Sequence, residues 1–311
     1  MKRFKNILTI VGSDSDPNTN RAVVRASALS QQNNGKLTLM DIIDPPHNTR
    51  RELNGIIKAE EIIDILVSER QKELELVAEK LRGNGIDVSV KVVSGRDFIE
   101  IVRQVLIGRH DLLIKVANRH TGSFDSCDFH IMRKCPQPVW LIKPDRDVEC
   151  RSVLAAVDLS LEESAEGRAL NTYIMDLATS LSCLHNSDLH ILSCWTLYGE
   201  NALRHSGFLK IADDSLEEML QQEERVNRTM LDNLIERYQN PRTTAHLIKG
   251  EPKVCIPAFV EANDIDVVVM GSVGRSGIPG LLIGNTAETV LQLIDSSVIT
   301  LKPAGFESPI K

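Results

Sequence analysis

Aromatic side chains are scarce in this chain: Phe, Trp and Tyr together make up 4% of its 311 residues. A surface that stacks the bases of single-stranded nucleic acid needs several exposed rings, so this composition disfavours such a function. Positive charge is short as well, because 36 Lys and Arg stand against 43 Asp and Glu and leave a net charge of −7. A duplex-binding face needs concentrated Lys and Arg, so we expect no nucleic-acid partner.

Long apolar runs and closely paired cysteines are also missing. The first residues, MKRFKNILTIVGSDSD, hold an apolar run only from Ile7 to Val11, which is too short for the core of a signal peptide. Nowhere does a run approach the roughly 20 residues of a membrane-spanning helix. None of the six cysteines is spaced Cys-x-x-Cys, and we expect them to be free thiols. These absences predict a cytoplasmic protein without a membrane partner.

The chain repeats itself with a period of roughly 150 residues, as expected of a duplicated domain. The copies align in the same order along the chain, with a short link near residues 143–152, and we predict domains at 1–146 and 150–311. Five pairs of segments carry the repeat: KNILTIVGSDSD with RSVLAAVDLSLE, ASALSQQNNGKLTLMDII with ATSLSCLHNSDLHILSCW, VKVVSGRD with AHLIKGEP, DLLIKV with DVVVMG, and PVWLIKP with SVITLKP.

Strand and helix patterns alternate in each copy. The strands are short Val, Ile and Leu runs with little polar alternation, which is typical of parallel strands covered by helices on both faces. Two tandem, doubly wound parallel sheets of five strands are therefore expected, in the α/β class. In the second copy the predicted strands are Val153–Val157, Leu189–Cys194, Thr244–Ile248, Val267–Met270 and Val298–Leu301, and the predicted helices are about 164–183, 214–238, 252–263 and 286–294.

A glycine-rich stretch, GSVGRSGIPGLLIGNT, follows the fourth strand of the second copy. Its glycines Gly271, Gly274 and Gly284 have the spacing Gly-x-x-Gly-x9-Gly, and Asp158 closes the first strand of the same copy. With the terminal strand VITLKP, these residues resemble the universal stress protein family in its tandem form, and among its members those of the E type. The family has Ser or Thr after the third glycine, where this chain has Asn285.

The resemblance implies an adenine-nucleotide alpha-hydrolase-like sheet with strand order 3-2-1-4-5, which binds ATP, with or without Mg²⁺, across strands 1 and 4. Carried over to this sequence, it implies that Val157 and Asp158 face adenine and ribose and that Met270 and Gly271 line the nucleotide. The expected phosphate cradle is Gly274, Gly284, Asn285 and Thr286, with Arg275 as an added cation.

The residue types of this stretch agree with a phosphate site on physical grounds. Glycines let the backbone approach a phosphate, and the free N–H groups and positive end of a following helix attract an anion. The alternative is a flexible connection with Asn285 as an ordinary helix N-cap. Because Asn285 lacks a hydroxyl, we expect Thr286 to supply one from the next position.

The first copy lacks both marks, because Gly12 stands where Asp158 is expected and Val116 stands where Gly271 is expected. We therefore expect no nucleotide of the family type there. Five residues of this copy are candidate zinc ligands, although their spacing matches no common structural zinc pattern. The alternative is that Asp125 or Asp128 caps the next helix and that the histidines are solvated or hydrogen-bonded. The candidates are His120, Asp125, Cys127, Asp128 and His130.

Three functions remain open. The first is a non-enzymatic stress-response protein whose second domain binds ATP as a regulatory ligand, and no base or nucleophile pair beside the loop points to catalysis. The second is a weak ATPase or a protein that phosphorylates itself on Ser272, Ser276 or Thr286. The third is an interaction scaffold whose apolar strands VWLIKP and VITLKP pair as edges. The resemblance implies that these edges join the halves as a pseudo-dimer or join whole chains as a homo-oligomer.

Overall fold

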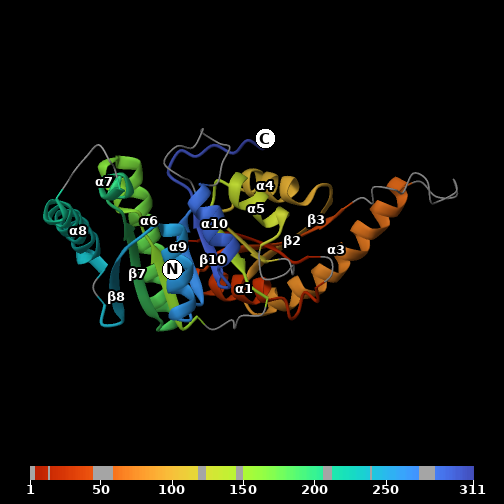
Figure 1. Ribbon diagram of the computed structural model, residues 1–311. Helices are drawn as coiled ribbons and strands as arrows, with labels where there is room; N and C mark the ends of the chain where they lie inside the picture. The colour runs from red at the N-terminus through yellow and green to blue at the C-terminus, as the bar shows by residue number, and fades with distance from the viewer. Residues whose placement is uncertain are drawn as a thin grey trace.

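The computed structural model describes residues 4–12, 15–44, 59–117, 124–144, 150–205, 212–238, 240–272 and 284–311. We call residues 4–144 the first half and residues 150–311 the second half. Within the described residues of the first half, strands and helices alternate along the chain (Figure 1). Its elements are β1 (Asn6–Ile10), α1 (Arg21–Asn33), β2 (Lys36–Ile43), α3 (Ala59–Gly83), β3 (Asp87–Ser94), α4 (Asp97–Ile107), β4 (Leu112–Val116), α5 (Ser126–Lys134) and β5 (Val139–Ile142).

The second half repeats this order, and its predicted strands and longer helices are found within a few residues of their expected ends. The short helix α7 and the two 3₁₀ helices η1 and η2 were not predicted, because such brief elements carry little periodic signal. The elements are β6 (Ser152–Ala156), η1 (Leu159–Glu163), α6 (Ala165–His185), β7 (Asp188–Trp195), α7 (Glu200–His205), α8 (Asp213–Ile235), η2 (Glu236–Tyr238), β8 (Thr243–Lys249), α9 (Pro252–Ala262), β9 (Val267–Gly271), α10 (Asn285–Leu293) and β10 (Ser297–Leu301).

Asparagines end the first helix of each half in the same way. Asn34 follows α1 with φ 49° and Asn186 follows α6 with φ 53°, both in the left-handed region. Asparagine tolerates this conformation better than other residues with a Cβ, and it lets the cap N–H bond back to the last turn. The repeated Asn therefore sets both turns into the second strand, and the duplication extends to local geometry.

All ten strands form one sheet with the order β3-β2-β1-β4-β5-β10-β9-β6-β7-β8. Read from its outer strand inward, each half follows the order 3-2-1-4-5, and its strands run parallel. The halves meet where β5 and β10 pair antiparallel, with Ile299 opposite Trp140. The pseudo-dimer expected from these two edges is thus present within one chain, and both edges are already paired.

Two apolar cores lie on opposite faces of this sheet, and each runs through both halves. The core under α1, α3, α6 and α8 contains Trp140 and Ile299, and the core under α4, α5, α9 and α10 contains Leu141 and Val298. These four junction residues are at most 1% exposed. Burial of a large apolar side chain stabilises the fold by about 1.5–3 kcal/mol, so the junction is a continuous part of the core.

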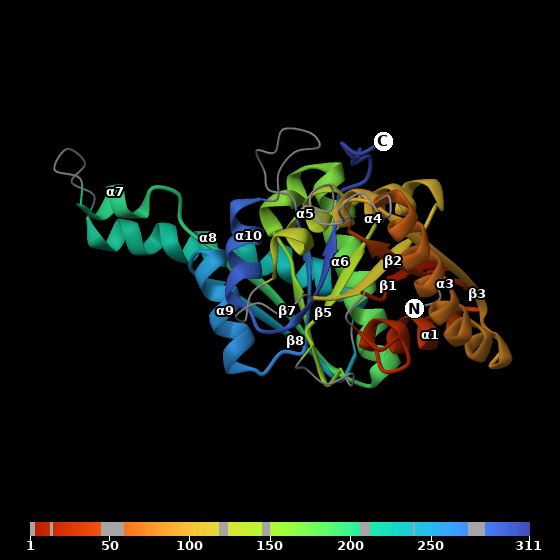
Figure 2. The ribbon, with the colours of Figure 1, turned by 90° about the vertical axis from the view of Figure 1, so that its right-hand side faces the viewer.

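The long helices α3 and α8 lie at opposite ends of the molecule in Figure 1. Figure 2 shows that α7 and part of α8 project beyond the body of the second half. Among the residues that the structure describes, no helix combines the length and apolarity needed to cross a membrane.

Candidate functional site

The carboxyl ends of β6 and β9 lie side by side in the second half. Ala156 pairs with Met270 in the parallel register, so Val157 and Asp158 continue β6 beside Gly271. Val157 and Met270 are 6% and 5% exposed, while Asp158 and Gly271 are half-buried. We call Val157, Asp158, Met270, Gly271 and Gly284 the second-half crevice. In doubly wound sheets, ligands bind at such a switch point outside the carboxyl ends of the strands.

Asp158 is held firmly at the end of β6. Its backbone N–H donates to the Asn171 side chain at 3.3 Å, and Asn171 donates back to its carbonyl at 2.9 Å. Its Oδ1 caps η1, accepting from the N–H of Ser160 at 3.1 Å and from the Ser160 hydroxyl at 2.6 Å. A half-buried carboxylate at a fixed position can accept hydrogen bonds from a polar ligand without further ordering.

A hydrogen bond joins the residues on either side of the segment between β9 and α10, because Gly284 N–H donates to the Ser272 carbonyl at 3.1 Å. The predicted residues Gly274 and Arg275, with Ser276, lie outside the described residues. A Cβ on Gly271 would lie 3.1 Å from Leu170 Cδ2, so a larger residue would have to displace that side chain. Ser272 itself is 0% exposed, which leaves its hydroxyl inaccessible as a phosphate acceptor.

Helix α10 begins without a side-chain cap. Its N-cap is Gly284, one residue before Asn285, so the alternative of Asn285 as the N-cap was wrong. Gly284 has φ −62° and ψ 140° and makes no side-chain cap hydrogen bond, while Asn285 and Thr286 are exposed on the first turn. The first N–H groups of a helix lack helical partners and carry its positive dipole end. This end of α10 is therefore suited to an anion.

The first half fills the same place with its own charges. Lys115 of β4 pairs with Ile10 of β1, just as Met270 of β9 pairs with Ala156 of β6. Its ammonium donates to Asp128 Oδ1 at 2.9 Å, and the two residues are 7% and 0% exposed. Asp128 lies three residues after the N-cap of α5, where the second half has Ala287 after Gly284. A buried ion pair thus replaces an apolar pair.

Asp125 caps α5 by accepting from Asp128 N–H at 2.7 Å, as the alternative to a zinc site predicted. Helix α5 therefore has its own carboxylate where α10 has only a glycine. A capping carboxylate satisfies one of the free N–H groups and offsets the dipole, so the end of α5 attracts an anion less. This contrast is the main difference between the two halves at corresponding positions.

The zinc candidates that lie within the described residues of the first half do not form a metal-binding group. Asp125 and Asp128 are engaged in the cap and the ion pair, and burial raises the pKa of the Cys127 thiol to about 12, which keeps it protonated. His130 is half-buried and stacks on Phe98 with ring centroids 4.4 Å apart, and its Nδ1 is buried without a hydrogen-bond partner. His120 lies outside the described residues, and within them no three His, Cys, Asp or Glu side chains form a metal-binding group.

Sequence reasoning missed two charged residues of the first half, Arg70 and Asp41. Arg70 reaches from α3 over the carboxyl end of β1, donating to the Gly12 carbonyl at 2.8 Å and to Asp41 Oδ2 at 2.7 Å. Burial raises the pKa of Asp41 against the lowering effect of Arg70. A single Asp inside the apolar strand LTLMDII is a signal for such a pair. The pair lies at Gly12, the position that corresponds to Asp158.

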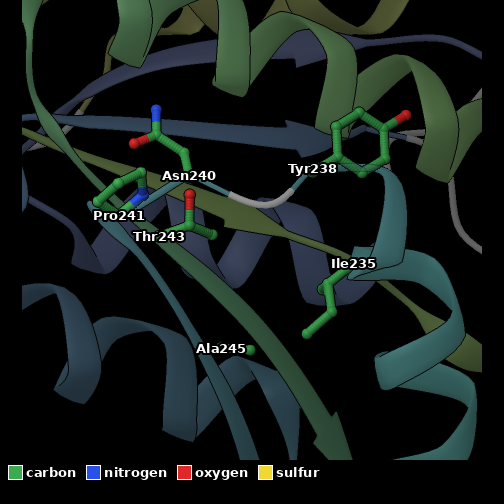
Figure 3. Close-up of a pocket in the computed structure, with 6 residues that line it drawn as sticks. All are labelled: Ile235, Tyr238, Asn240, Pro241, Thr243 and Ala245. Carbon is green, nitrogen blue, oxygen red and sulfur yellow. The ribbon is translucent and has the colours of Figure 1, made fainter.

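A pocket of about 430 Å³ lies elsewhere, at the amino end of the outer strand β8 (Figure 3). It is lined by Tyr238 and Ile235 beside η2 and by Thr243 and Ala245 of β8, with Asn240 and Pro241 between them. Because β8 is parallel to β7 and β6, this pocket is at the opposite end of the strands from the second-half crevice. The chemistry of the crevice does not extend to it.

Fold and crevice together define a duplicated, doubly wound α/β protein of the kind that binds ligands at the carboxyl ends of its strands. The chain belongs to the universal stress protein family, whose model matches residues 3–143 and again residues 150–302. Two matches in one chain make it a tandem member of that family.

Relatives and solved structures match the whole length. Universal stress protein E of Photorhabdus laumondii subsp. laumondii is 29% identical over 325 residues, spanning 100% of this chain and 99% of the relative. The protein of the same name from Escherichia coli K12 is 25% identical over 328 residues, spanning 100% and 98%. A crystal structure of a functionally unknown protein from Pseudomonas aeruginosa PAO1 has a TM-score of 0.72 at 24% identity, covering 97% of this chain and 94% of that one. This last likeness concerns the fold.

Proposed function

We propose that this protein is a non-enzymatic, cytoplasmic stress-response protein whose second half binds one adenine nucleotide, ATP with or without Mg²⁺, as a regulatory ligand. Membership of the universal stress protein family supports the stress-response role. The observation that carries the nucleotide proposal is the start of α10 at Gly284, which has no side-chain cap, together with Asp158 at the end of β6, the strand that pairs with β9.

In this proposal Asp158 accepts hydrogen bonds from the ribose hydroxyls, and Val157 and Met270 provide apolar contact for the base. The N–H groups at Asn285 and Thr286 bind the phosphates where Gly284 starts the helix, and Gly271 lines the nucleotide. Gly274 and Arg275 complete the cradle. Phosphate at a helix N-terminus needs no charged side chain beneath it, because N–H groups and the dipole supply the attraction.

The contrast with the first half supports a single nucleotide site. There the Asp125 carboxylate occupies the corresponding cap, the Lys115–Asp128 ion pair occupies the adjoining space, and Arg70 covers Gly12. A phosphate approaching α5 would meet the negative Asp125 and would lose water while gaining fewer free N–H donors than at α10.

A regulatory rather than catalytic role follows from the placement of the acidic group. Asp158 stands at the sugar end of the proposed ligand, away from a terminal phosphate, and the buried hydroxyl of Ser272 donates to the Leu301 carbonyl at 3.3 Å. Self-phosphorylation at Ser272 would require that strand end to open. Homodimers of whole chains, which the resemblance implies, would use surfaces other than the paired strands β5 and β10.

Calorimetric titration of the full chain with Mg-ATP tests the proposal through Gly284→Asp. The φ of −62° at Gly284 suits any residue, so the new side chain caps α10 as Asp125 caps α5. Replacing a glycine N-cap by Asp gains only about a few tenths of a kcal/mol, so the variant should be at least as stable as the wild type. It should nevertheless bind ATP at least about tenfold more weakly, because the cap occupies N–H groups and adds negative charge.

Gly284→Asn is the matched control, because it caps the helix without a charge and should weaken binding less than Gly284→Asp. Equal affinities of the wild type and Gly284→Asp for ATP would refute the phosphate cradle. An absence of heat for the wild type would refute the proposed function itself. Release of phosphate or a gain in protein mass during the titration would show the enzymatic alternative instead.

A further inference from the structure

Two histidines face each other near the outer edge of the second half. His190 on β7 and His246 on β8 are diagonal neighbours, since His190 pairs with Thr244 and Leu192 pairs with His246. His190 Nδ1 and His246 Nε2 are 3.1 Å apart, and the ring planes are inclined by 30° with centroids 5.3 Å apart. Neighbouring parallel strands thus present two ring nitrogens to one point.

Phe259 of α9 fixes both rings. Its centroid lies 4.6 Å from that of His246 and 5.6 Å from that of His190. Aromatic packing of this kind restricts ring rotation, so the two nitrogens are held at their present separation without a ligand. Preorganised donor atoms bind with less loss of conformational entropy than mobile ones.

The site is reachable from solvent. Both histidines are half-buried, Thr244 beside His190 is exposed, and β8 is the outermost strand of the sheet. Within the described residues, the hydrogen bond between the two rings is the only one recorded for either side chain. Neither ring has a buried nitrogen without a partner, so the outward nitrogens are open to water.

Both rings favour the neutral state. Burial lowers the pKa of His190, against a raising effect of Asp188, and burial together with His190 lowers the pKa of His246. Neutral imidazole is the form that binds a metal, because a lone pair must be available on the ligating nitrogen.

We propose that His190 and His246 together bind one divalent transition-metal ion, with zinc as the test case, between β7 and β8. Two nitrogens bound to zinc at about 2.0–2.1 Å in a tetrahedron lie about 3.3 Å apart, close to the observed separation. His190 would bind through Nδ1 as the Nε2–H tautomer and His246 through Nε2 as the Nδ1–H tautomer. Both rings stay neutral, so this exchange of tautomers releases no net proton.

The remaining coordination positions are left to water. No third His, Cys, Asp or Glu joins the two histidines in the described part of the chain. The carboxylate of Asp188 lies on the same strand two residues earlier and is paired with Arg242 at 3.3 Å. Imidazole suits zinc, copper and nickel, while magnesium and calcium prefer oxygen ligands, so selectivity for the first group is expected.

The site is independent of the proposed nucleotide function. It lies near the amino end of β7 and at the middle of β8, on the face covered by α9, and uses none of the crevice residues. A metal there would link the outermost strand β8 to β7, because binding to the folded state alone stabilises that state.

The test is calorimetric titration of the full chain with Zn²⁺ in a buffer that does not chelate metals. The wild type should bind one more zinc ion per chain than His190→Asn or His246→Asn, and zinc should raise the melting temperature of the wild type but not of these two variants. Asn keeps a polar side chain at each position, and His205→Asn, at an exposed residue of α7, is the control that should behave as the wild type.

Equal zinc stoichiometry in the wild type and in the His190→Asn/His246→Asn double variant would overturn the proposal, wherever else zinc binds. Circular dichroism of each variant without metal shows whether it is folded. If a single variant unfolds, the conservative variants His190→Gln and His246→Gln supply the comparison, and unchanged stoichiometry in those folded variants is equally decisive against the site.

Discussion

The Nζ atom of Lys302 lies 2.6 Å from the carbonyl oxygen of Met132 and donates a hydrogen bond to it across the boundary between the halves. The same group donates to Ser272 Oγ at 2.6 Å, at the start of the glycine-rich stretch. Lys143, at the corresponding place after β5, lies 3.8 Å from Asp295 Oδ1 of the second half. Each half therefore extends a buried lysine into the other, on either side of the antiparallel pair β5 and β10.

The first prediction concerns the protonation of Lys302. Burial lowers its pKa from 10.5 to about 8, so the folded state releases this proton at lower pH than the unfolded state does. The free-energy cost of burying the charged ammonium is complete below pH 8 and disappears as pH rises toward 10.5. From pH 8 to 9 the wild type should therefore gain stability relative to Lys302→Met, by up to about 1.4 kcal/mol per pH unit.

Urea unfolding of both proteins at pH 7, 8 and 9 measures this difference directly. Lys253→Met is the control, because the Lys253 side chain is 51% exposed and should show no such trend. A stability difference between wild type and Lys302→Met that stays constant with pH would contradict the buried position of the ammonium.

The second prediction concerns a contact between helices of different halves. Arg25 of α1 donates from Nη1 to His185 Nε2 of α6 at 2.6 Å, and its guanidinium lies 5.1 Å from the Trp140 ring centroid. Burial, with Arg25 adding to the effect, lowers the pKa of His185 from 6.5 to about 4. The unfolded state then binds a proton that the folded state refuses, so this contribution to stability is present above pH 6.5 and is lost progressively as pH falls toward 4.

After allowance for partial solvent exposure, the loss should reach about 2 kcal/mol. The variant His185→Gln keeps an acceptor for Arg25 but does not titrate. Its stability relative to that of the wild type should therefore be higher at pH 5 than at pH 7.5. Thermal melts across that range measure the effect, with exposed His205→Gln as control. Parallel pH profiles for wild type and His185→Gln would count against a neutral His185.

The third prediction concerns the ion pair of the first half. Asp128→Ala leaves Lys115 buried without its carboxylate and should cost about 3–5 kcal/mol of unfolding free energy. The double variant Lys115→Met/Asp128→Ala installs the second-half pair, and it should recover most of this loss, because apolar replacement of a buried pair is commonly neutral or stabilising.

Denaturant unfolding of wild type, both single variants and the double variant forms a cycle that isolates the coupling. Asp87→Ala is the matched control, because it breaks the Lys36–Asp87 pair, whose side chains are 73% and 69% exposed, and it should change stability by less than about 0.5 kcal/mol. Additive effects of Lys115→Met and Asp128→Ala would show that the two groups do not interact.

Much of this architecture is predictable because the information is local. The apolar runs and their repetition predict the strands. The family resemblance implies that the edge strands holding Trp140 and Ile299 join the halves, although not their register. The capping of α5 is local too, since Asp125 directly precedes this short helix and Asp128 lies in its first turn. These features depend on neighbours in sequence or on the symmetry of the duplication.

The remainder depends on contacts that a pattern does not encode. Arg70 and Asp41 are 29 residues apart, and Arg25 and His185 are 160 residues apart. Which distant charge a buried Asp or Arg finds is decided by the packing of the helices over the sheet. The lack of a first-half nucleotide motif was readable from the sequence, whereas the charges that fill its place were not.

The central claim is that one chain holds one nucleotide, in its second half. Native mass spectrometry of the full chain with ATP counts bound nucleotides directly and separates the sites through variants. At one ATP concentration the account predicts one ATP per wild-type chain, one per Lys115→Met/Asp128→Ala chain and a clearly smaller occupied fraction for Gly284→Asp. Two nucleotides on the wild type, or equal occupancy of Gly284→Asp and the wild type, would contradict it.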